Sequence, residues 1–209
     1  MQIKVCGMTQ MEQVKQLDEM GVAYIGFIFY PASKRFVLTK NTLQDIADLQ
    51  LTQAKKVGVF VNEPLTSILD IIKTAQLDMV QLHGDETVAY CKRVQEEVST
   101  IKVFRVGDSF PNFEEYVLAV DYFLFDTDSQ WYGGTGQHFN WEIIKSASIP
   151  TPFFLSGGIG INDVQGIQVM AGTKAGKTML AVDLNSQFEE KPGVKQIEKI
   201  KKFIQDVNH

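Results

Sequence analysis

Cys6 and Asp126 are the residues of this sequence whose types best suit acid–base chemistry. Cys6 closes the first short apolar segment of the chain, and Asp126 follows the apolar run at residues 122–125. A thiolate can remove a proton as a general base, and a carboxyl group with a raised pKa can donate one as a general acid. An isolated cysteine is more often a small buried hydrophobic residue, and a carboxylate at such a position can simply cap the next loop. Residue type alone leaves both interpretations open.

Two later segments have the composition of a phosphate site. Gly157 and Gly158 follow Ser156, and Asn185 and Ser186 follow the last apolar run. Glycine lets backbone N–H groups approach phosphate oxygens because it has no Cβ. A Gly-Gly pair by itself is more often only a turn. The two segments together favour phosphate binding, because loops in these places often bind phosphate in β/α barrels.

Arg35, Gln81 and His83 are further candidates for ligand binding. The forked guanidinium of Arg35 suits a carboxylate, although a solvated loop charge is the more common fate of an arginine. A metal site at His83 is disfavoured because no second histidine or cysteine stands at ligand spacing, and His138 and His209 are remote in sequence. We therefore expect no metal.

These residues belong to a regular series of short apolar segments. The segments are rich in Val, Ile and Phe, and their apolar content is near-continuous, which is typical of parallel strands covered on both faces. We predict strands at residues 2–6, 24–29, 56–61, 79–83, 101–105, 122–126, 153–156 and 179–184.

Amphipathic stretches follow these segments and indicate helices. Residues 11–20, 43–49, 68–72, 87–97, 111–119 and 141–147 are the first six. Gly21 is placed to end the first helix, and Asn162 to cap a helix through residues 164–170. A last helix is expected to start near Pro192 and Gly193.

The alternation of strands and helices along the whole chain predicts parallel β/α units in one domain, residues 1–209. The repeat size fits a (β/α)₈ TIM barrel, an α/β fold with a parallel eight-stranded barrel. A doubly wound open sheet is the main alternative, because periodicity does not distinguish the two.

Polar or glycine-rich clusters end most of the predicted strands. In a parallel barrel the active site gathers at the carboxyl ends of the strands, so this bias predicts an enzyme. Asp183, in the last cluster, is expected to line the substrate site beside Asn185 and Ser186. The clusters lie at residues 6–9, 61–63, 81–85, 105, 126–128, 156–158 and 183–186.

Composition limits the classes of molecule that the protein is expected to bind and the place where it is expected to act. The formal net charge of −5 and the pI of about 5.2 argue against a nucleic-acid-binding protein but allow an anionic ligand in a locally positive pocket. No apolar run approaches the roughly 20 residues that span a bilayer. Two widely separated cysteines and the lack of a basic leader predict a cytoplasmic protein.

The sequence resembles the phosphoribosylanthranilate isomerase family of tryptophan biosynthesis over nearly its whole length. Residues 4–9, Lys-Val-Cys-Gly-Met-Thr, are similar to the opening motif of that family, and residues 80–86, Val-Gln-Leu-His-Gly-Asp-Glu, to another. Where the family often has Ser-Ser-Gly-Val-Glu, this chain has Asn-Ser-Gln-Phe-Glu at residues 185–189. Further similar segments are residues 26–30, 33–37, 57–62, 125–127, 133–136, 139–141, 155–159, 181–186 and 192–193.

This resemblance implies an Amadori rearrangement of N-(5-phosphoribosyl)anthranilate, the third pathway-specific step of L-tryptophan biosynthesis. Asp126 would protonate the ribose ring oxygen as general acid, and Cys6 would remove the C2 proton as general base. The iminium nitrogen is its own electron sink, so the resemblance implies no cofactor. Arg35 would bind the anthranilate carboxylate.

The same resemblance assigns the remaining contacts. Backbone amides of the glycine pair and of Asn185 and Ser186 would hold the phosphate, and Gln81 and His83 would lie near the sugar. A monomer and a homodimer both remain open. The alternatives are another phosphate-binding barrel enzyme, such as a sugar-phosphate epimerase or an indole-precursor lyase, and a non-catalytic sensor of phosphorylated metabolites. Cys6 and Asp126 together favour the isomerase, because a sensor needs neither an acid nor a base.

Overall fold

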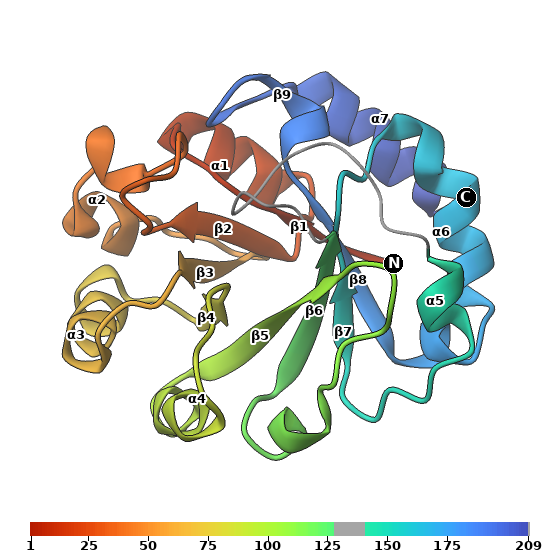
Figure 1. The fold of residues 1–209 in the computed structure, drawn as a ribbon. Coiled ribbons are helices and arrows are strands. Elements are labelled where there is room, and N and C mark those ends of the chain that lie inside the picture. Colours follow the sequence, from red (N-terminus) through yellow and green to blue (C-terminus); the bar gives the residue numbers. More distant parts are fainter. Residues whose placement is uncertain (128–140, 209) are drawn as a thin grey trace.

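The strands of the chain close into a parallel barrel (Figure 1). The computed structural model describes residues 1–127 and 141–208, and in that part each strand pairs with the next and β8 pairs with β1. This closure confirms the barrel and rules out the open sheet. The strands are β1 (Gln2–Val5), β2 (Tyr24–Ile28), β3 (Lys55–Phe60), β4 (Met79–Leu82), β5 (Ser99–Val106), β6 (Tyr122–Thr127), β7 (Phe153–Leu155) and β8 (Met179–Leu184).

Each strand overlaps its predicted segment, because a continuous apolar run bounded by polar residues marks a strand buried on both faces. Several residues that the sequence singled out lie outside the described part of the chain. They are Asp128, His138, His209 and the similar segments at residues 133–136 and 139–140.

Helices surround the barrel (Figure 1). None of the helices in residues 1–127 and 141–208 is long and apolar enough to cross a membrane. The α-helices described are α1 (Met11–Glu19), α2 (Leu43–Ala47), α3 (Leu65–Ala75), α4 (Val88–Gln95), α5 (Glu142–Lys145), α6 (Val164–Ala171) and α7 (Ile197–Val207).

Two helix predictions were wrong in detail. Residues 111–119 contain only a 3₁₀ turn, Glu114–Tyr116. Phe113, directly before the turn, and Tyr116 both pack on Phe104 of β5. A three-residue spacing of rings fits a 3₁₀ turn as well as an α-helix. Asn162 does not cap α6 but lies within the 3₁₀ turn η3 (Ile161–Asp163), where the Asp163 carboxylate accepts the Gly160 N–H at 2.6 Å.

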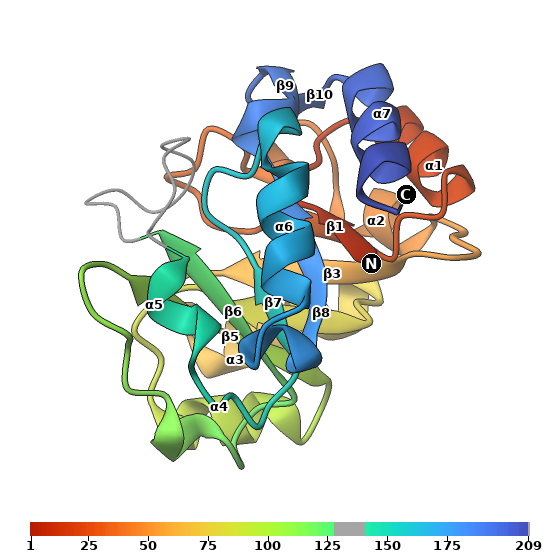
Figure 2. The ribbon, with the colours of Figure 1, turned by 90° about the vertical axis from the view of Figure 1, so that its right-hand side faces the viewer.

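The last helix also begins later than predicted. Strands β9 (Glu189–Lys191) and β10 (Val194–Lys195) form an antiparallel hairpin, and α7 starts only at Ile197. Pro192 and Gly193 make the turn of the hairpin, with Gly193 at φ +83. Proline followed by glycine suits both a helix start and a tight turn, so local sequence could not decide. Figure 2 shows the hairpin directly beyond the carboxyl end of β8.

Side-chain alternation along the strands creates an apolar floor and a polar layer inside the barrel. Successive side chains of a strand point to opposite faces, so one set packs under the helices and the other points inward. The apolar floor consists of Tyr24, Val57, Met79, Ile101, Val103, Leu124, Phe154 and Ala181. Gln81 of β4 and Asp183 of β8 stand two residues after Met79 and Ala181 of the floor, so their side chains also point inward. Lys4 of β1 pairs with Asp183 and lies at the same depth in the barrel. Cys6, His83, Asp126 and Asn185 follow at the mouth.

A buried ion pair ties two loops at this mouth to β5. Lys102 Nζ lies 3.0 Å from Glu86 Oε2 and also donates to the Gly84 carbonyl at 2.8 Å. Glu86 Oε1 accepts the N–H groups of Asn62 and Gly84 at 2.9 and 3.0 Å. Glu86 therefore fixes the loops that follow β3 and β4.

We expect Lys102→Met to lower the free energy of unfolding by about 3–5 kcal/mol, because it leaves the Glu86 carboxylate buried without its cation. Urea denaturation of the purified variant measures this loss. The exposed Lys202 supplies the matched control, and Lys202→Met should change stability by less than about 0.5 kcal/mol. Equal stability of the two variants would contradict the expectation.

Candidate active site

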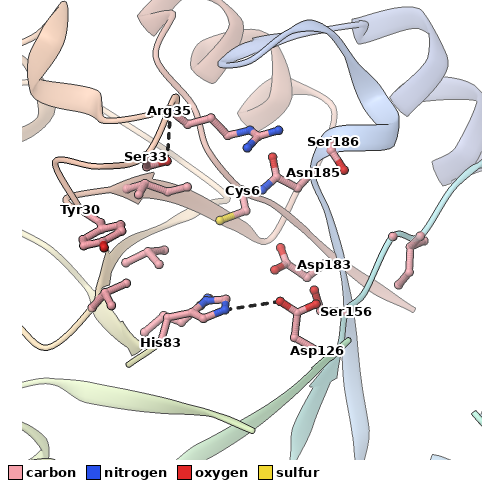
Figure 3. A pocket seen from close by; sticks show the side chains of 16 residues that line it. Cys6, Tyr30, Ser33, Arg35, His83, Asp126, Ser156, Asp183, Asn185 and Ser186 are labelled. Atoms are coloured by element: carbon pink, nitrogen blue, oxygen red, sulfur yellow. Dashed lines mark hydrogen bonds and ion pairs between the residues drawn. The ribbon is translucent and has the colours of Figure 1, made fainter. Parts of the chain in front are cut away.

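A pocket of about 720 Å³, which includes space open to solvent, lies at the carboxyl ends of the strands (Figure 3). Cys6, which follows β1, and Asp126, in β6, both turn into it, so the structure brings together the two residues best suited to acid–base chemistry. The predicted site residues that line the pocket are Cys6, Arg35, Gln81, His83, Asp126, Gly158, Asp183, Asn185 and Ser186.

The backbone places Cys6 firmly. Its N–H donates to the Leu184 carbonyl at 2.9 Å, and the N–H of Gly7 donates to the Gly26 carbonyl at 2.9 Å. A Cβ on Gly26 would lie 2.8 Å from Cys6 Sγ, so only glycine leaves room for the thiol. The side chain is 4% exposed and not in a disulfide.

Charged side chains surround the Cys6 thiol within the barrel. Lys4 Nζ, fully buried, lies 2.9 Å from Asp183 Oδ1. Burial raises the pKa of the Cys6 thiol, while the positive charges of Lys4 and Lys195 oppose that rise and the charge of Asp183 adds to it. Although burial alone would lower it, the Asp183 carboxylate raises the pKa of Lys4. Lys4 is therefore held as a cation beneath the thiol.

Asp126 is linked to Gln81 through His83. His83 Nε2 lies 3.4 Å from Asp126 Oδ2, and Gln81 Nε2 lies 3.0 Å from His83 Nδ1. Since an amide NH₂ only donates, His83 Nδ1 accepts and its Nε2 carries the proton toward Asp126. The other oxygen of Asp126, Oδ1, accepts the Thr127 N–H at 2.9 Å. The carboxyl group is thereby held at the pocket wall (Figure 3).

Gln81 carries a polar atom that the described residues leave unused. Its side chain is 1% exposed, and its Oε1 has no hydrogen-bond partner in residues 1–127 and 141–208. A buried acceptor without a donor is costly. A hydroxyl group of a ligand in the pocket would satisfy it.

The two predicted phosphate segments differ in their roles. Gly158 lines the pocket, whereas Gly157, at φ +98, turns the chain against Thr127, whose Oγ1 would lie 2.3 Å from an added Cβ. Asn185 and Ser186 line the same side of the pocket, and Ser186 begins the 3₁₀ turn η5 (Ser186–Phe188). That turn forms although the chain lacks the family's usual glycine there.

Arg35 is an ion-paired residue instead of a solvated loop charge. Its Nε donates to both carboxylate oxygens of Glu189 at 3.0 Å, and its Nη2 donates to Oε2 at 2.7 Å. Although burial alone would raise it, hydrogen bonds from Arg35 and the charge of Lys195 lower the pKa of Glu189. Arg35 still lines the pocket.

Several site residues were missed at the sequence level. Tyr30 and Ser33 line the pocket from the loop after β2. Lys4 had a signal: a lysine two residues before Cys6 on a buried strand must point the same way as the thiol. Lys195 had none, because it stands where a helix was predicted. Glu189 falls in the segment at residues 185–189 that was compared with the family motif, but it was given no role.

The fold is a closed β/α barrel, and a thiol, a side-chain carboxyl group and an imidazole surround one pocket where its strands end. This arrangement defines a barrel enzyme that uses acid–base catalysis. No three His, Cys, Asp or Glu side chains in residues 1–127 and 141–208 are grouped so that they could hold a metal ion.

Comparison with known proteins identifies the family. A family model described as N-(5'-phosphoribosyl)anthranilate (PRA) isomerase matches residues 3–206. The chain is 41% identical to an N-(5'-phosphoribosyl)anthranilate isomerase of Parabacteroides distasonis, over 99% of this chain and 93% of that protein. The chain belongs to the N-(5'-phosphoribosyl)anthranilate isomerase family.

Solved structures agree. The phosphoribosyl anthranilate isomerase of Thermotoga maritima is 32% identical and superimposes with a TM-score of 0.81, covering 99% of this chain and 98% of that one. Another structure of such an isomerase, 30% identical with a TM-score of 0.74 over 99% of this chain and 98% of that one, contains reduced 1-(o-carboxyphenylamino)-1-deoxyribulose 5-phosphate.

Proposed function

We propose that this protein is an aldose–ketose isomerase that converts N-(5-phosphoribosyl)anthranilate into 1-(2-carboxyphenylamino)-1-deoxyribulose 5-phosphate, the third pathway-specific step of L-tryptophan biosynthesis. The observation that carries the proposal is the pocket shared by Cys6 and Asp126. The reaction needs one group that gives a proton and another that takes one. The reduced product analogue bound by a relative supports this choice of substrate.

Ring opening is the first step, and Asp126 is its general acid. The carboxyl proton moves to the ribose ring oxygen while the bond from that oxygen to C1 breaks. The nitrogen lone pair forms the C1=N double bond of an iminium ion, so the electrons balance. His83 Nε2–H, 3.4 Å from Asp126, holds the carboxyl group in place. General acid catalysis of this kind contributes about 10²–10⁴-fold in rate.

Proton removal at C2 is the second step, and Cys6 is its general base. The thiolate takes the C2 proton, the C–H electrons form a C1=C2 double bond, and the iminium nitrogen becomes a neutral amine. The enolamine then loses the C2 hydroxyl proton and gains one at C1, which gives the ketone. Cys6 has gained the proton that Asp126 has lost, so one proton transfer restores the enzyme. Lys4 and Lys195 favour the thiolate against the effect of burial.

Substrate contacts follow from the two ends of the pocket. Arg35 binds the anthranilate carboxylate, and the backbone around Gly158, Asn185 and Ser186 binds the phosphate. Gln81 Oε1 and His83 face the sugar between them. Asp183 lines the same pocket, and its bond to Lys4 at 2.9 Å also makes it a support for the Cys6 environment.

We expect Arg35→Ala to raise KM at least about tenfold and to lower kcat less, because it removes a charge-assisted contact that substrate and transition state share. Steady-state kinetics measure the two constants separately. The neighbouring Lys34 is exposed, and Lys34→Ala is the control, with both constants near those of the unaltered protein. An unchanged KM in Arg35→Ala would remove the carboxylate contact from the proposal.

Fluorescence tests the function as a whole. The purified protein, treated with a chelator and given no cofactor, should consume the anthranilate fluorescence of N-(5-phosphoribosyl)anthranilate with multiple turnovers. A metabolite sensor would shift the signal in proportion to the protein added and then stop. No change in the signal would reject the isomerase.

We also propose that residues 1–209 act as one catalytic domain in the cytoplasm.

A further inference from the structure

Glu189 connects two parts of the pocket that the proposed function uses separately. Its carboxylate is 4% exposed and accepts hydrogen bonds from Arg35 on one side. On the other side, Lys195 Nζ donates to Glu189 Oε1 at 2.8 Å and to Asn185 Oδ1 at 2.9 Å. One buried carboxylate therefore links the carboxylate-binding arginine to the phosphate-binding loop.

The stereochemistry of the Arg35 contact is specific. A guanidinium group can bind a carboxylate along its Nε–Nη2 edge or along its Nη1–Nη2 edge. Glu189 bonds to Nε and Nη2, which is the first of these edges. The Nη1–Nη2 edge is the one not used by Glu189. Figure 3 shows the guanidinium reaching over the pocket toward Asn185.

Packing fixes the rest of the Arg35 side chain. Gly7 has φ +77, and a Cβ there would lie 2.6 Å from Arg35 Cδ and 3.0 Å from Asn185 Oδ1. The aliphatic part of Arg35 thus crosses Gly7, and the same glycine lies against Asn185. Neither side chain has room to move toward the backbone.

Charge balance favours an anion beside this network. Arg35 and Lys195 carry two positive charges and Glu189 one negative charge, so the three groups together carry one net positive charge. Without Glu189, the cations of Arg35 and Lys195 would repel each other with no carboxylate between them. Lys195 is fully buried, so its charge could not turn to solvent instead.

The hairpin supplies both Glu189 and Lys195. The Gly193 N–H donates to Glu189 Oε1 at 3.0 Å, and Thr9 Oγ1 donates to the Gly193 carbonyl at 2.8 Å. The turn of the hairpin is thereby fixed to the loop after β1. Glu189 is thus held from the hairpin side, and Arg35 is held by its packing against Gly7.

We propose that Glu189 is a positioning residue that holds Arg35 by one edge and presents its other edge to the substrate carboxylate, with Lys195 anchoring the arrangement to Asn185. This inference rests on the proposed function and explains how the protein would select the anthranilate carboxylate of the substrate. Glu189 does not touch the substrate. It removes the rotational freedom that Arg35 would otherwise lose on binding.

The test compares two ligands that differ only in the carboxylate. One is reduced 1-(o-carboxyphenylamino)-1-deoxyribulose 5-phosphate, and the other is the same molecule with a phenylamino group. Calorimetry gives the dissociation constants of both for the unaltered protein and for Glu189→Gln. The ratio of the two constants measures the preference for the carboxylate in each protein.

We expect Glu189→Gln to reduce this preference by about tenfold, the value of one well-oriented charge-assisted contact, while affinity for the phenylamino ligand changes less. In the turnover assay KM should rise more than kcat falls. The exposed neighbour Glu190 gives the matched control, and Glu190→Gln should keep the preference of the unaltered protein. A variant that binds the carboxylate ligand more tightly would show that Glu189 competes for Arg35, which would overturn the proposal.

Glu189→Asp covers the case in which Glu189→Gln fails to fold. It retains a counter-ion for Lys195 but is one methylene shorter, so the Arg35 edge should lose its alignment and the preference should again fall. A preference equal to that of the unaltered protein would overturn the proposal. If the unaltered protein itself does not prefer the carboxylate ligand, the Arg35 contact of the proposed function fails. If the unaltered protein prefers the carboxylate ligand and both Glu189 variants show the same preference, only the positioning role fails.

Discussion

Asp126→Asn should lower kcat by about 10²–10⁴-fold with little change in KM. The amide has nearly the shape of the carboxyl group, and its single oxygen can accept either the His83 Nε2–H or the Thr127 N–H, so the shape of the pocket is retained with one hydrogen bond lost. It has no acidic proton for the ribose ring oxygen, so the first bond cleavage loses its general acid. Stopped-flow fluorescence under single-turnover conditions measures the loss on the chemical steps directly.

Asp108 provides a matched control for this substitution. It is an exposed aspartate in the loop after β5, and Asp108→Asn should retain the activity of the unaltered protein. A kcat for Asp126→Asn within a few-fold of the control would move the general acid to another group. His83 would then be the first candidate, because its Nε2 lies 3.4 Å from Asp126 at the same wall.

Cys6→Ser should reduce kcat by a similar factor of about 10²–10⁴. A serine hydroxyl occupies nearly the same place but ionises far less readily than a thiol, so the C2 proton loses its base. Cys91 supplies the matched control: it is buried and does not line the pocket, and Cys91→Ser should keep most of the activity. Comparable rates for the two serine variants would exclude Cys6 as the base.

The pH dependence provides a second reading of the same residue. The reaction needs a proton on Asp126 and none on Cys6, so the active protein carries one proton across this pair. That proton is lost as pH rises through the Cys6 pKa, and kcat/KM should fall there. Burial raises the pKa of Cys6, with Asp183 of β8 acting in the same sense and Lys4 of β1 and Lys195 of β10 opposing it. The loss of activity should therefore occur at higher pH than the ordinary thiol pKa. Cys6→Ser should lack this loss over the same pH range.

The strands and the two central residues of the site were predictable because local sequence determines them. The run Phe123–Phe125 has no polar residue and ends at Asp126, so it had to be a buried strand with a carboxyl group at its end. Cys6 is predictable in the same way. Closure of the barrel is different, since it depends on β1 pairing with β8 and no local pattern reports a contact between residues so far apart.

Pairs made across the fold were not predictable from one sequence. Arg35 and Glu189 are separated by 154 positions, and Lys4 and Asp183 by 179. Arg35 could have been a solvated loop charge, and no local pattern indicated that Glu189 or Lys4 forms an ion pair. Gly157 and Gly158 illustrate a finer limit, because only the positions of Thr127 and the pocket show that Gly157 turns the chain and Gly158 lines the pocket.

A crystal structure of this protein with reduced 1-(o-carboxyphenylamino)-1-deoxyribulose 5-phosphate tests the central claim most directly. We predict that Cys6 Sγ lies within about 3.5 Å of C2 and that Asp126 approaches the sugar oxygen corresponding to the ring oxygen of the substrate. The phosphate should lie at Gly158 and Ser186, and the benzoate at Arg35. A ligand bound with C2 remote from Cys6, or with its sugar out of reach of Asp126, would contradict the assignment of these two residues to one reaction.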